Sequence, residues 1–256
     1  MADLKLSACI EMITFGEPDF VKRIDGVADA GLPAFEFWGW GNKDLPAIRR
    51  RADDLGLAIA TFGISSTGAL VDPANTQAWI GGVGESFEKA KEMRAPTLIV
   101  TTGDEMPIPR EEQHNAIIAG LKGIAPIAEA NGINVVLEPL NILVDHAGYY
   151  LSTSAEGFDI VRAVGSPRVK LLFDIYHQQI TEGNLIQNIT RNIDLIGHFH
   201  VADVPGRHEP GTGEIDYKNV FAAIAKTNYD GFIGLEYSPT GDAKEALLTT
   251  RRLAGV

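Results

Sequence analysis

Eight short runs of apolar, mostly β-branched residues recur along the chain, and amphipathic stretches separate them. The runs cover residues 4–10, 34–37, 57–62, 97–101, 133–137, 169–173, 196–201 and 232–235. Each run is continuous rather than alternating between apolar and polar residues, which is typical of parallel strands buried on both faces. The chain is therefore predicted to alternate buried strands with helices.

The stretches between these runs carry helical signals. Apolar residues recur at helical spacing in 20–28 and 117–128, and Pro126 inside the second stretch predicts a kink. Asp72-Pro73 and residues 152–156 are typical of helix starts, the second because capping side chains precede an apolar period. Glycines that precede strand runs, where helices commonly end in a left-handed residue, are Gly31, Gly56, Gly132 and Gly231.

Eight strands that alternate with helices over 256 residues predict an α/β fold, a single-domain (β/α)8 TIM barrel over residues 1–256. A doubly wound open sheet is the alternative, but it usually carries a glycine-rich phosphate loop after the first strand. Residues 11–17 hold no G-x-G-x-x-G motif, and Gly81-Gly82-Val83-Gly84 lies inside a helical stretch. The barrel is the favoured prediction.

Composition excludes several classes of protein. The net charge of −12, from 22 Lys and Arg against 34 Asp and Glu, disfavours binding to nucleic acid. Cys9 is the only cysteine and cannot form an intramolecular disulfide, which is typical of a reducing compartment. Residues 1–6 lack a signal-peptide pattern, and no apolar run approaches the roughly 18 residues of a membrane helix. We therefore expect a cytoplasmic protein without membrane or nucleic-acid partners.

Four successive strand runs deliver a carboxylate or an imidazole at their carboxyl ends, where barrels of this type place their active sites. These residues are Glu138, Asp174, His200 and Glu236. Each carboxylate alone could instead cap a helix, but together they would repel one another without a cation. Such a set suits Mg²⁺, Mn²⁺ or Co²⁺. His198 shares a face with His200, which is nearer the barrel mouth and is the preferred ligand.

Other residues near the same strand ends are candidate substrate contacts. His177 follows Asp174 by three residues and could hydrogen-bond a substrate hydroxyl or orient a ligand. Arg207 lies in a loop rich in glycine and proline, and its guanidinium could bind a carboxylate or a hydroxyl pair of a small substrate. Trp38, Trp40 and Phe15 could form a wall of the pocket, or equally pack inside the protein or at a subunit contact.

Several motifs extend these observations along the chain. They are L-S-A-C-I-E-M from residue 6, D-A-G-L-P-A-F-E-F from 29, V-L-E-P-L-N from 136, L-F-D-I-Y-H from 172, H-F-H-V-A-D-V-P-G-R-H-E-P-G-T-G-E-I-D-Y from 198 and G-L-E-Y from 234. Together they resemble the xylose-isomerase-like TIM barrels, and within these the hydroxypyruvate isomerase family. The resemblance covers nearly the whole chain.

The resemblance implies a divalent metal held by Glu138, Asp174, His200 and Glu236. It also implies that Glu138 and Glu236 act as the acid/base pair, with His177 and Arg207 contacting the substrate. Two departures lie near the pocket. Hydroxypyruvate isomerases can carry an amide at the position of His200, where histidine is closer to the ketose 3-epimerases, and the F-W-G-W stretch from residue 37 also differs. Both departures affect substrate identity more than reaction type.

The chemistry that these parts predict is proton transfer next to a carbonyl. The expected reaction is the isomerisation of hydroxypyruvate to 2-hydroxy-3-oxopropanoate through an enediolate, with a ketose 3-epimerase or a 2-oxo-tetronate isomerase as the alternative. More distant alternatives are a lyase like the inosose dehydratases and a non-catalytic barrel subunit. The multi-zinc DNA-repair endonucleases need more than the six histidines present. Association into a dimer or tetramer is also expected.

Overall fold

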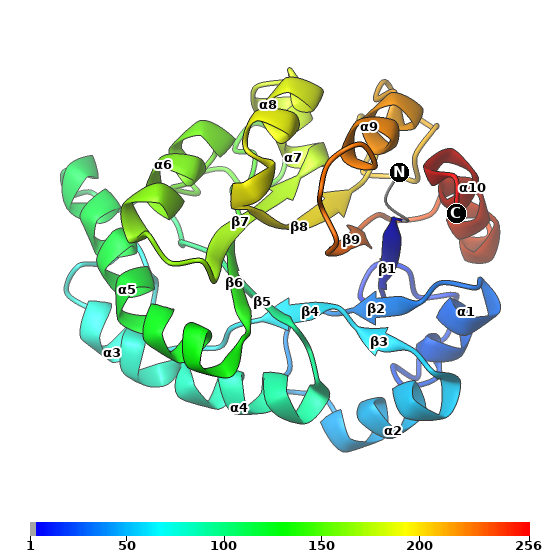
Figure 1. Cartoon of the computed structure of the whole chain (residues 1–256), viewed down its shortest axis with the longest axis horizontal. Coiled ribbons are helices and arrows are strands. Elements are labelled where there is room, and N and C mark those ends of the chain that lie inside the picture. Colours follow the sequence, from blue (N-terminus) through cyan, green and yellow to red (C-terminus); the bar gives the residue numbers. More distant parts are fainter. Residues whose placement is uncertain (1–3) are drawn as a thin grey trace.

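A ring of parallel strands forms the centre of the molecule, and helices surround it (Figure 1). The computed structural model describes residues 4–256. Its strands are β1 (Lys5–Cys9), β2 (Ala34–Glu36), β3 (Ala58–Ile59), β4 (Thr61–Gly63), β5 (Thr97–Val100), β6 (Asn134–Leu137), β7 (Val169–Asp174), β8 (Ile196–Val201) and β9 (Phe232–Leu235). Every strand pair is parallel, and β1 pairs with β9, so the two ends of the chain meet in the sheet.

The predicted run 57–62 forms two short strands rather than one. β3 pairs with β2, whereas β4 pairs with β5. Ala60 lies between them and donates its backbone N–H to Phe35 at 2.9 Å, so the chain passes from one neighbour to the other without leaving the ring. The sheet order β3-β2-β1-β9-β8-β7-β6-β5-β4 thus describes a barrel joined through one segment. The TIM-barrel prediction is confirmed, and the open doubly wound sheet is wrong.

Helices connect successive strands on the outside of the barrel. They are α1 (Arg23–Asp29), α2 (Leu45–Leu55), α3 (Thr76–Gly82), α4 (Gly84–Met93), α5 (Arg110–Asn131), α6 (Ser154–Val164), α7 (Ile175–Thr181), α8 (Leu185–Arg191), the 3-10 turn η1 (Ile193–Leu195), α9 (Tyr217–Ile224) and α10 (Ala243–Ala254). Thr153 caps α6 by accepting the N–H of Glu156, as the sequence predicts. α5 continues through Pro126 to its end.

Two of the predicted helix boundaries are wrong. Asp72 does not start α3, because its side chain accepts the N–H of Ala74 within a separate turn and the helix begins at Thr76. Gly231 does not end a helix, since α9 stops at Ile224. The glycine instead provides space, because a Cβ there would lie 2.5 Å from the hydroxyl of Tyr229. By contrast, Gly31, Gly56 and Gly132 follow α1, α2 and α5 with positive φ, as predicted.

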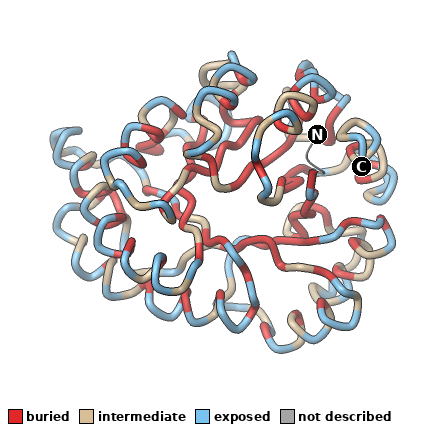
Figure 2. Tube along the Cα trace, viewed as in Figure 1, coloured by how far each residue is buried: buried red, intermediate tan, exposed pale blue. Residues whose placement is uncertain are grey.

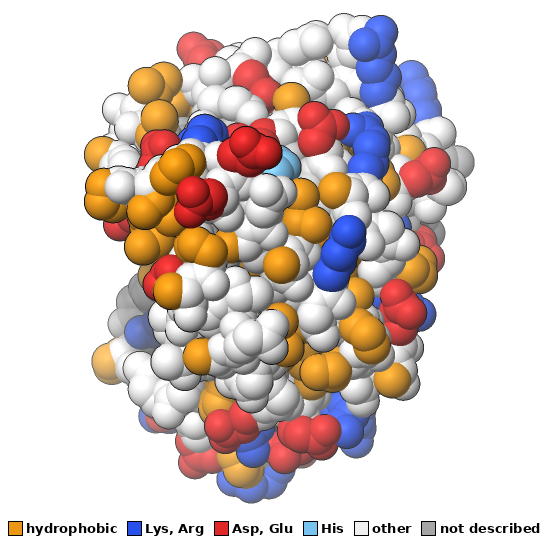
Figure 3. Space-filling view, turned by 90° about the vertical axis from the view of Figure 1, so that its left-hand side faces the viewer, with side chains coloured by type: hydrophobic (Ala, Val, Ile, Leu, Met, Phe, Trp, Pro, Cys, Tyr) orange, Lys and Arg blue, Asp and Glu red, His pale blue; other side chains and the backbone are white. Residues whose placement is uncertain are grey.

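Burial follows the layers of the barrel. Figure 2 shows the strands largely buried and the outer faces of the helices exposed. On the face shown in Figure 3, acidic and basic side chains are interspersed with hydrophobic ones. Within residues 4–256, no helix has both the length and the apolar character needed to cross a membrane.

A pair of glycine substitutions tests the left-handed helix end. Gly132 has φ +67°, and a Cβ there would meet only Arg168 at 3.9 Å, so Gly132→Ala should destabilise the protein by about 1–2 kcal/mol through the backbone alone. Gly81 lies in α3 with open space around a Cβ, so Gly81→Ala should stabilise by up to about 1 kcal/mol. Urea unfolding measures both, and equal effects of the same sign would contradict this assignment.

Candidate active site

Four neighbouring strands bring their terminal side chains to one end of the barrel. Asp174 of β7 is in register with His200 of β8, which in turn is in register with Gly234 of β9. Glu138 and Glu236 follow β6 and β9 directly, and their backbone N–H groups extend the ladders by donating to Val100 and Val201 at 3.0 Å. The register of the parallel sheet therefore places the four predicted ligands side by side.

The four side chains form one compact cluster. One ligand atom from each of Glu138, Asp174, His200 and Glu236 lies within 4.8 Å of the others, and all four residues are buried. His200 Nδ1 is 3.2 Å from Glu138, 3.3 Å from Glu236 and 3.8 Å from Asp174. Three carboxylates and one imidazole are a donor set that suits a divalent cation such as Mg²⁺ or Mn²⁺. These residues therefore fit a divalent-metal site.

Ionisation in the cluster reflects the crowding of negative charge. Burial raises the pKa of Asp174, and the neighbouring Glu236 adds to this effect while Arg207 and His200 oppose it. Burial would disfavour a charged ring at His200, but Glu236 and the other adjacent carboxylates raise its pKa well above its usual value. Without a cation, the imidazolium is thus the charge that balances the carboxylates. A bound divalent cation could take over this role.

His177 lies beside this cluster with a fixed tautomer. Its Nδ1 accepts the backbone N–H of Asn141 at 3.2 Å and lies 2.7 Å from the Asn141 side-chain amide nitrogen. The ring proton is therefore on Nε2, which lines the pocket and has no hydrogen-bond partner among residues 4–256. Burial, with a further contribution from Arg207, lowers the pKa of His177 to about 4. The ring is a neutral hydrogen-bond donor at pH 7.

Arg207 is placed over the cluster by the loop that follows β8. The buried Asp203 carboxylate organises this loop by accepting four backbone N–H groups at 2.8–3.0 Å, those of Val204, Gly211, Gly213 and Ile215. Arg207 Nη2 donates to Glu236, and the Arg207 carbonyl accepts the N–H of Ser238 at 2.9 Å. Arg207 Nε is buried without a partner in the described part of the chain. As predicted, Arg207 reaches the pocket.

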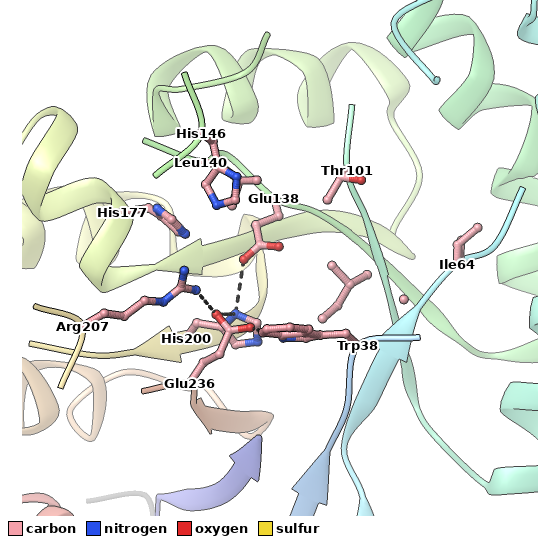
Figure 4. Close-up of a pocket in the computed structure, with 12 residues that line it drawn as sticks. Trp38, Ile64, Thr101, Glu138, Leu140, His146, His177, His200, Arg207 and Glu236 are labelled. Carbon is pink, nitrogen blue, oxygen red and sulfur yellow. Dashed lines mark hydrogen bonds and ion pairs between the residues drawn. The ribbon is translucent and has the colours of Figure 1, made fainter. Parts of the chain in front are cut away.

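A cavity of about 340 Å³ lies above these residues. Figure 4 shows Glu138 and Glu236 pointing into it from opposite sides, with His177 and Arg207 beyond them and Trp38 at the other end. Trp38 Nε1 donates to Glu236 Oε1 at 2.6 Å. The non-polar part of its wall is formed by Trp38, Gly63, Ile64, Ile99 and Leu140. Polar groups therefore gather at the end that holds the carboxylates.

Of the three predicted wall aromatics, Trp38 alone is confirmed. Trp40 packs against the hydrophobic core. Phe15 has φ +55°, and its ring lies under α1, where a Cβ on Gly26 would be 2.6 Å from it. The absence of a side chain at Gly26 is what lets the ring pack there rather than over the pocket.

The polar residues of the site that were not assigned from the sequence are Thr101 and His146, which line the cavity, and Glu36 and Asn141, which contact its histidines. Glu36 ends β2, is 2% exposed, and lies 2.9 Å from His200 Nε2. A charged residue at the end of the apolar run 34–37 was the available signal. Asn141 lies in the V-L-E-P-L-N motif, but only the structure shows that it orients His177.

The structure is a TIM barrel whose strand ends carry three carboxylates and one imidazole that fit a divalent cation, and comparison with known proteins identifies the family. Residues 24–253 match the family model described as xylose isomerase-like TIM barrel. The chain belongs to this family, as predicted.

Named relatives share nearly the full length of the chain. The 2-oxo-tetronate isomerase of Cupriavidus necator is 31% identical over 91% of this chain and 92% of its own. The hydroxypyruvate isomerase of Escherichia coli is 29% identical over 92% of this chain and 94% of its own. A crystal structure of a protein titled AP endonuclease, family 2, from Brucella melitensis is 26% identical, with a TM-score of 0.92 over 97% of this chain and 98% of that one. Ketose 3-epimerases also share the fold. The chain is an enzyme of the isomerase class, as predicted.

The tautomer and neutrality of His177 can be tested by pH titration. Because its folded pKa of about 4 lies below the unfolded value near 6.5, the ring should remain neutral from pH 8 to about pH 5. The unfolded chain binds this proton first, so the contribution of His177 to stability should be lost as pH falls from about 6.5 through 4. Histidine ring NMR signals measure the titration, and a midpoint near 6.5 would contradict the assignment.

Proposed function

We propose that the protein is a metal-dependent isomerase that interconverts hydroxypyruvate and 2-hydroxy-3-oxopropanoate. The proposal rests on one observation: a single cavity holds both a set of side chains that fit a divalent cation and buried nitrogen atoms that lack hydrogen-bond partners. Four residues with the donor set of a divalent-metal site line or underlie the cavity, and buried nitrogen atoms of His177, His200 and Arg207 lack hydrogen-bond partners among residues 4–256. Unpartnered buried donors are costly unless a ligand satisfies them.

Glu138, Asp174, His200 and Glu236 would hold the cation, which we expect to be Mg²⁺ or Mn²⁺. When bound, a divalent cation supplies positive charge that polarises a carbonyl and stabilises negative charge developing on adjacent substrate oxygens. Side chains of the protein carry out the proton transfers and bind the substrate.

Glu138 and Glu236 are the proposed acid/base pair. One carboxylate removes the proton from the carbon that carries the substrate hydroxyl, which leaves an enediolate. A proton then returns to the neighbouring carbon. The former hydroxyl gives up its proton and becomes the aldehyde oxygen, and the former carbonyl oxygen takes up a proton and becomes the new hydroxyl. No atoms are gained or lost. His200 and Arg207 hold the pKa of Glu236 well below its usual value despite burial, so this group is ionised and able to accept a proton.

His177 and Arg207 are proposed to bind the substrate. The neutral His177 donates from Nε2 to a substrate oxygen, and Arg207 offers its unpartnered Nε to the carboxylate of a hydroxy-oxo acid. Arg207 is held by loop contacts to Ser238 and by stacking at 5.2 Å over the Tyr176 ring, so its position is set before the substrate arrives.

The second candidate is an isomerase or 3-epimerase acting on a longer substrate, a 2-oxo-tetronate or a ketose. The size of the cavity favours it, because about 340 Å³ is more room than a three-carbon acid needs. Epimerisation uses the same groups but returns the proton to the opposite face of the same carbon. The position of Glu138 and Glu236 on opposite sides of the cavity suits this outcome equally (Figure 4).

Solvent-deuterium incorporation distinguishes these reactions. The protein is incubated in D₂O with hydroxypyruvate, 2-oxo-tetronates, D-fructose or D-tagatose, with Mn²⁺ or Mg²⁺ and separately with a chelator. Metal-dependent exchange with a new aldehyde from hydroxypyruvate supports the proposal, and a new epimer from a ketose supports the second candidate. Loss of water would indicate a lyase. If folded, metal-loaded protein incorporates deuterium into none of these compounds, both candidates are contradicted.

Substitution of the two glutamates tests their roles. Glu138→Gln and Glu236→Gln should each lower the exchange rate by about 10²–10⁴-fold, because each removes a group that transfers protons. Glu214→Gln is the matched control, an exposed glutamate in the loop after β8, and should leave the rate unchanged. NMR time courses measure the rates, and a loss below tenfold in either site variant would remove that residue from the acid/base pair.

A further inference from the structure

We propose that Glu36 is a positioning residue of the metal centre. Its carboxylate fixes the ring of His200 so that Nδ1 faces the metal-binding carboxylates as a ligand. This inference rests on the metal site of the proposed function, but it concerns a residue outside the four ligands and a strand on another side of the barrel. Nothing in its test depends on turnover.

Glu36 bridges the two histidines of β8. Its Oε1 lies 2.9 Å from His200 Nε2, and its Oε2 lies 3.2 Å from His198 Nε2. All three side chains are at most 2% exposed, so water does not compete for these contacts. The Glu36 carboxylate thus faces one imidazole with each of its two oxygens.

The position of the proton on His200 follows from this contact. Oε1 lies 2.9 Å from Nε2, and Nε2 must carry hydrogen because two lone pairs at this distance would repel each other, although the N–H direction does not meet hydrogen-bond geometry. When a bound cation replaces the second proton of the imidazolium, hydrogen on Nε2 leaves Nδ1 with its lone pair. That lone pair faces Glu138, Glu236 and Asp174 at 3.2–3.8 Å. Glu36 thus sets both the tautomer and the orientation that a metal ligand needs, as carboxylates behind ligating histidines do.

Gly234 makes the contact possible. Glu36 stands on β2 and His200 on β8, with β1 and β9 between them in the sheet. Gly234 is the β9 residue in register with His200. A Cβ at this glycine would overlap Glu36 Oε1 and would lie 2.7 Å from His200 Cδ2. The missing side chain is therefore the space through which Glu36 reaches the histidine.

If Glu36 and the two histidines of β8 bind a cation themselves, the number of metal ions per chain changes. Ligand atoms of Glu36, His198 and His200 also lie within 4.8 Å of one another, so this group could itself take a cation. This group offers one carboxylate and two imidazoles, whereas the four-residue cluster offers three carboxylates, so a hard divalent cation such as Mg²⁺ or Mn²⁺ prefers the four-residue cluster. Two Mn²⁺ ions per chain in calorimetry would overturn the positioning role.

The first test needs no substitution. Long-range ¹H–¹⁵N NMR of the Mg²⁺-loaded protein reports which ring nitrogen of each histidine carries hydrogen. The proposal predicts hydrogen on Nε2 and a metal-bound Nδ1 for His200. Hydrogen on Nδ1, or on both nitrogens, in the metal-loaded protein would overturn it.

The second test compares Mn²⁺ affinity among variants by calorimetry. Glu36→Gln should raise the Mn²⁺ Kd by about 10–100-fold, since it removes the carboxylate behind the ligand. Gly234→Ala keeps every charge but pushes Glu36 away from His200, so it should raise the Kd in the same direction. Because both substitutions disrupt the same contact, the Mn²⁺ Kd of the double variant should be no higher than the higher Kd of the two single variants.

Ser7→Ala is the matched control. Ser7 is fully buried, pairs with Gly234 from the neighbouring strand β1, and its hydroxyl has no hydrogen-bond partner among residues 4–256. Its Mn²⁺ Kd should stay within about twofold of the wild type, since it is not part of the carboxylate–histidine contact. Thermal unfolding in chelator shows which variants remain folded.

The outcomes separate this inference from the proposed function. Wild-type Mn²⁺ affinity in both folded Glu36→Gln and folded Gly234→Ala overturns the positioning role, even where the enzyme isomerises its substrate. A wild type that binds Mn²⁺ and depends on Glu36 for it, but exchanges no deuterium, contradicts the proposed function alone. A wild type that binds no divalent cation contradicts both.

Discussion

The site depends on the concentration of negative charge at one end of the barrel. Glu138, Asp174 and Glu236 converge within 4.8 Å where little water can separate them, so a compensating positive charge must lie among them. In the metal-free chain, His200 and Arg207 supply that charge, and the shifted pKa values of Asp174, His200 and Glu236 record it. The same demand for positive charge is what makes the cluster a site for a divalent cation.

The barrel imposes this convergence through backbone register. Parallel strands β6 to β9 bring residues that are far apart in the sequence to the same end of the barrel. The register of each strand is fixed, because a shift by one residue would turn its buried apolar side chains outward. The segments that follow the strands then add two hydrogen-bond donors, Arg207 and His177. Asp203 organises the loop that carries Arg207, and Asn141 orients His177, so both donors are directed by buried polar contacts.

Much of this arrangement could be predicted from the sequence, because barrel strands are buried runs and strand ends are visible as the first polar residue after each run. Glu138, Asp174 and Glu236 stand at such positions. The role of Glu36 could not be predicted, since its contact with His200 crosses two intervening strands and depends on the missing side chain of Gly234. The sequence could not decide between the possible positions of Phe15 for a similar reason, because its packing depends on the space left by the missing side chain of Gly26.

The central claim is that these four side chains form a divalent-metal centre on which proton transfer depends. Anomalous diffraction from a crystal of the protein grown with Mn²⁺ tests it most directly. The account predicts one anomalous peak per chain, bounded by the carboxylates of Glu138, Asp174 and Glu236 and by Nδ1 of His200. A peak between Glu36 and His198, or no peak in this cluster at saturating Mn²⁺, would contradict it.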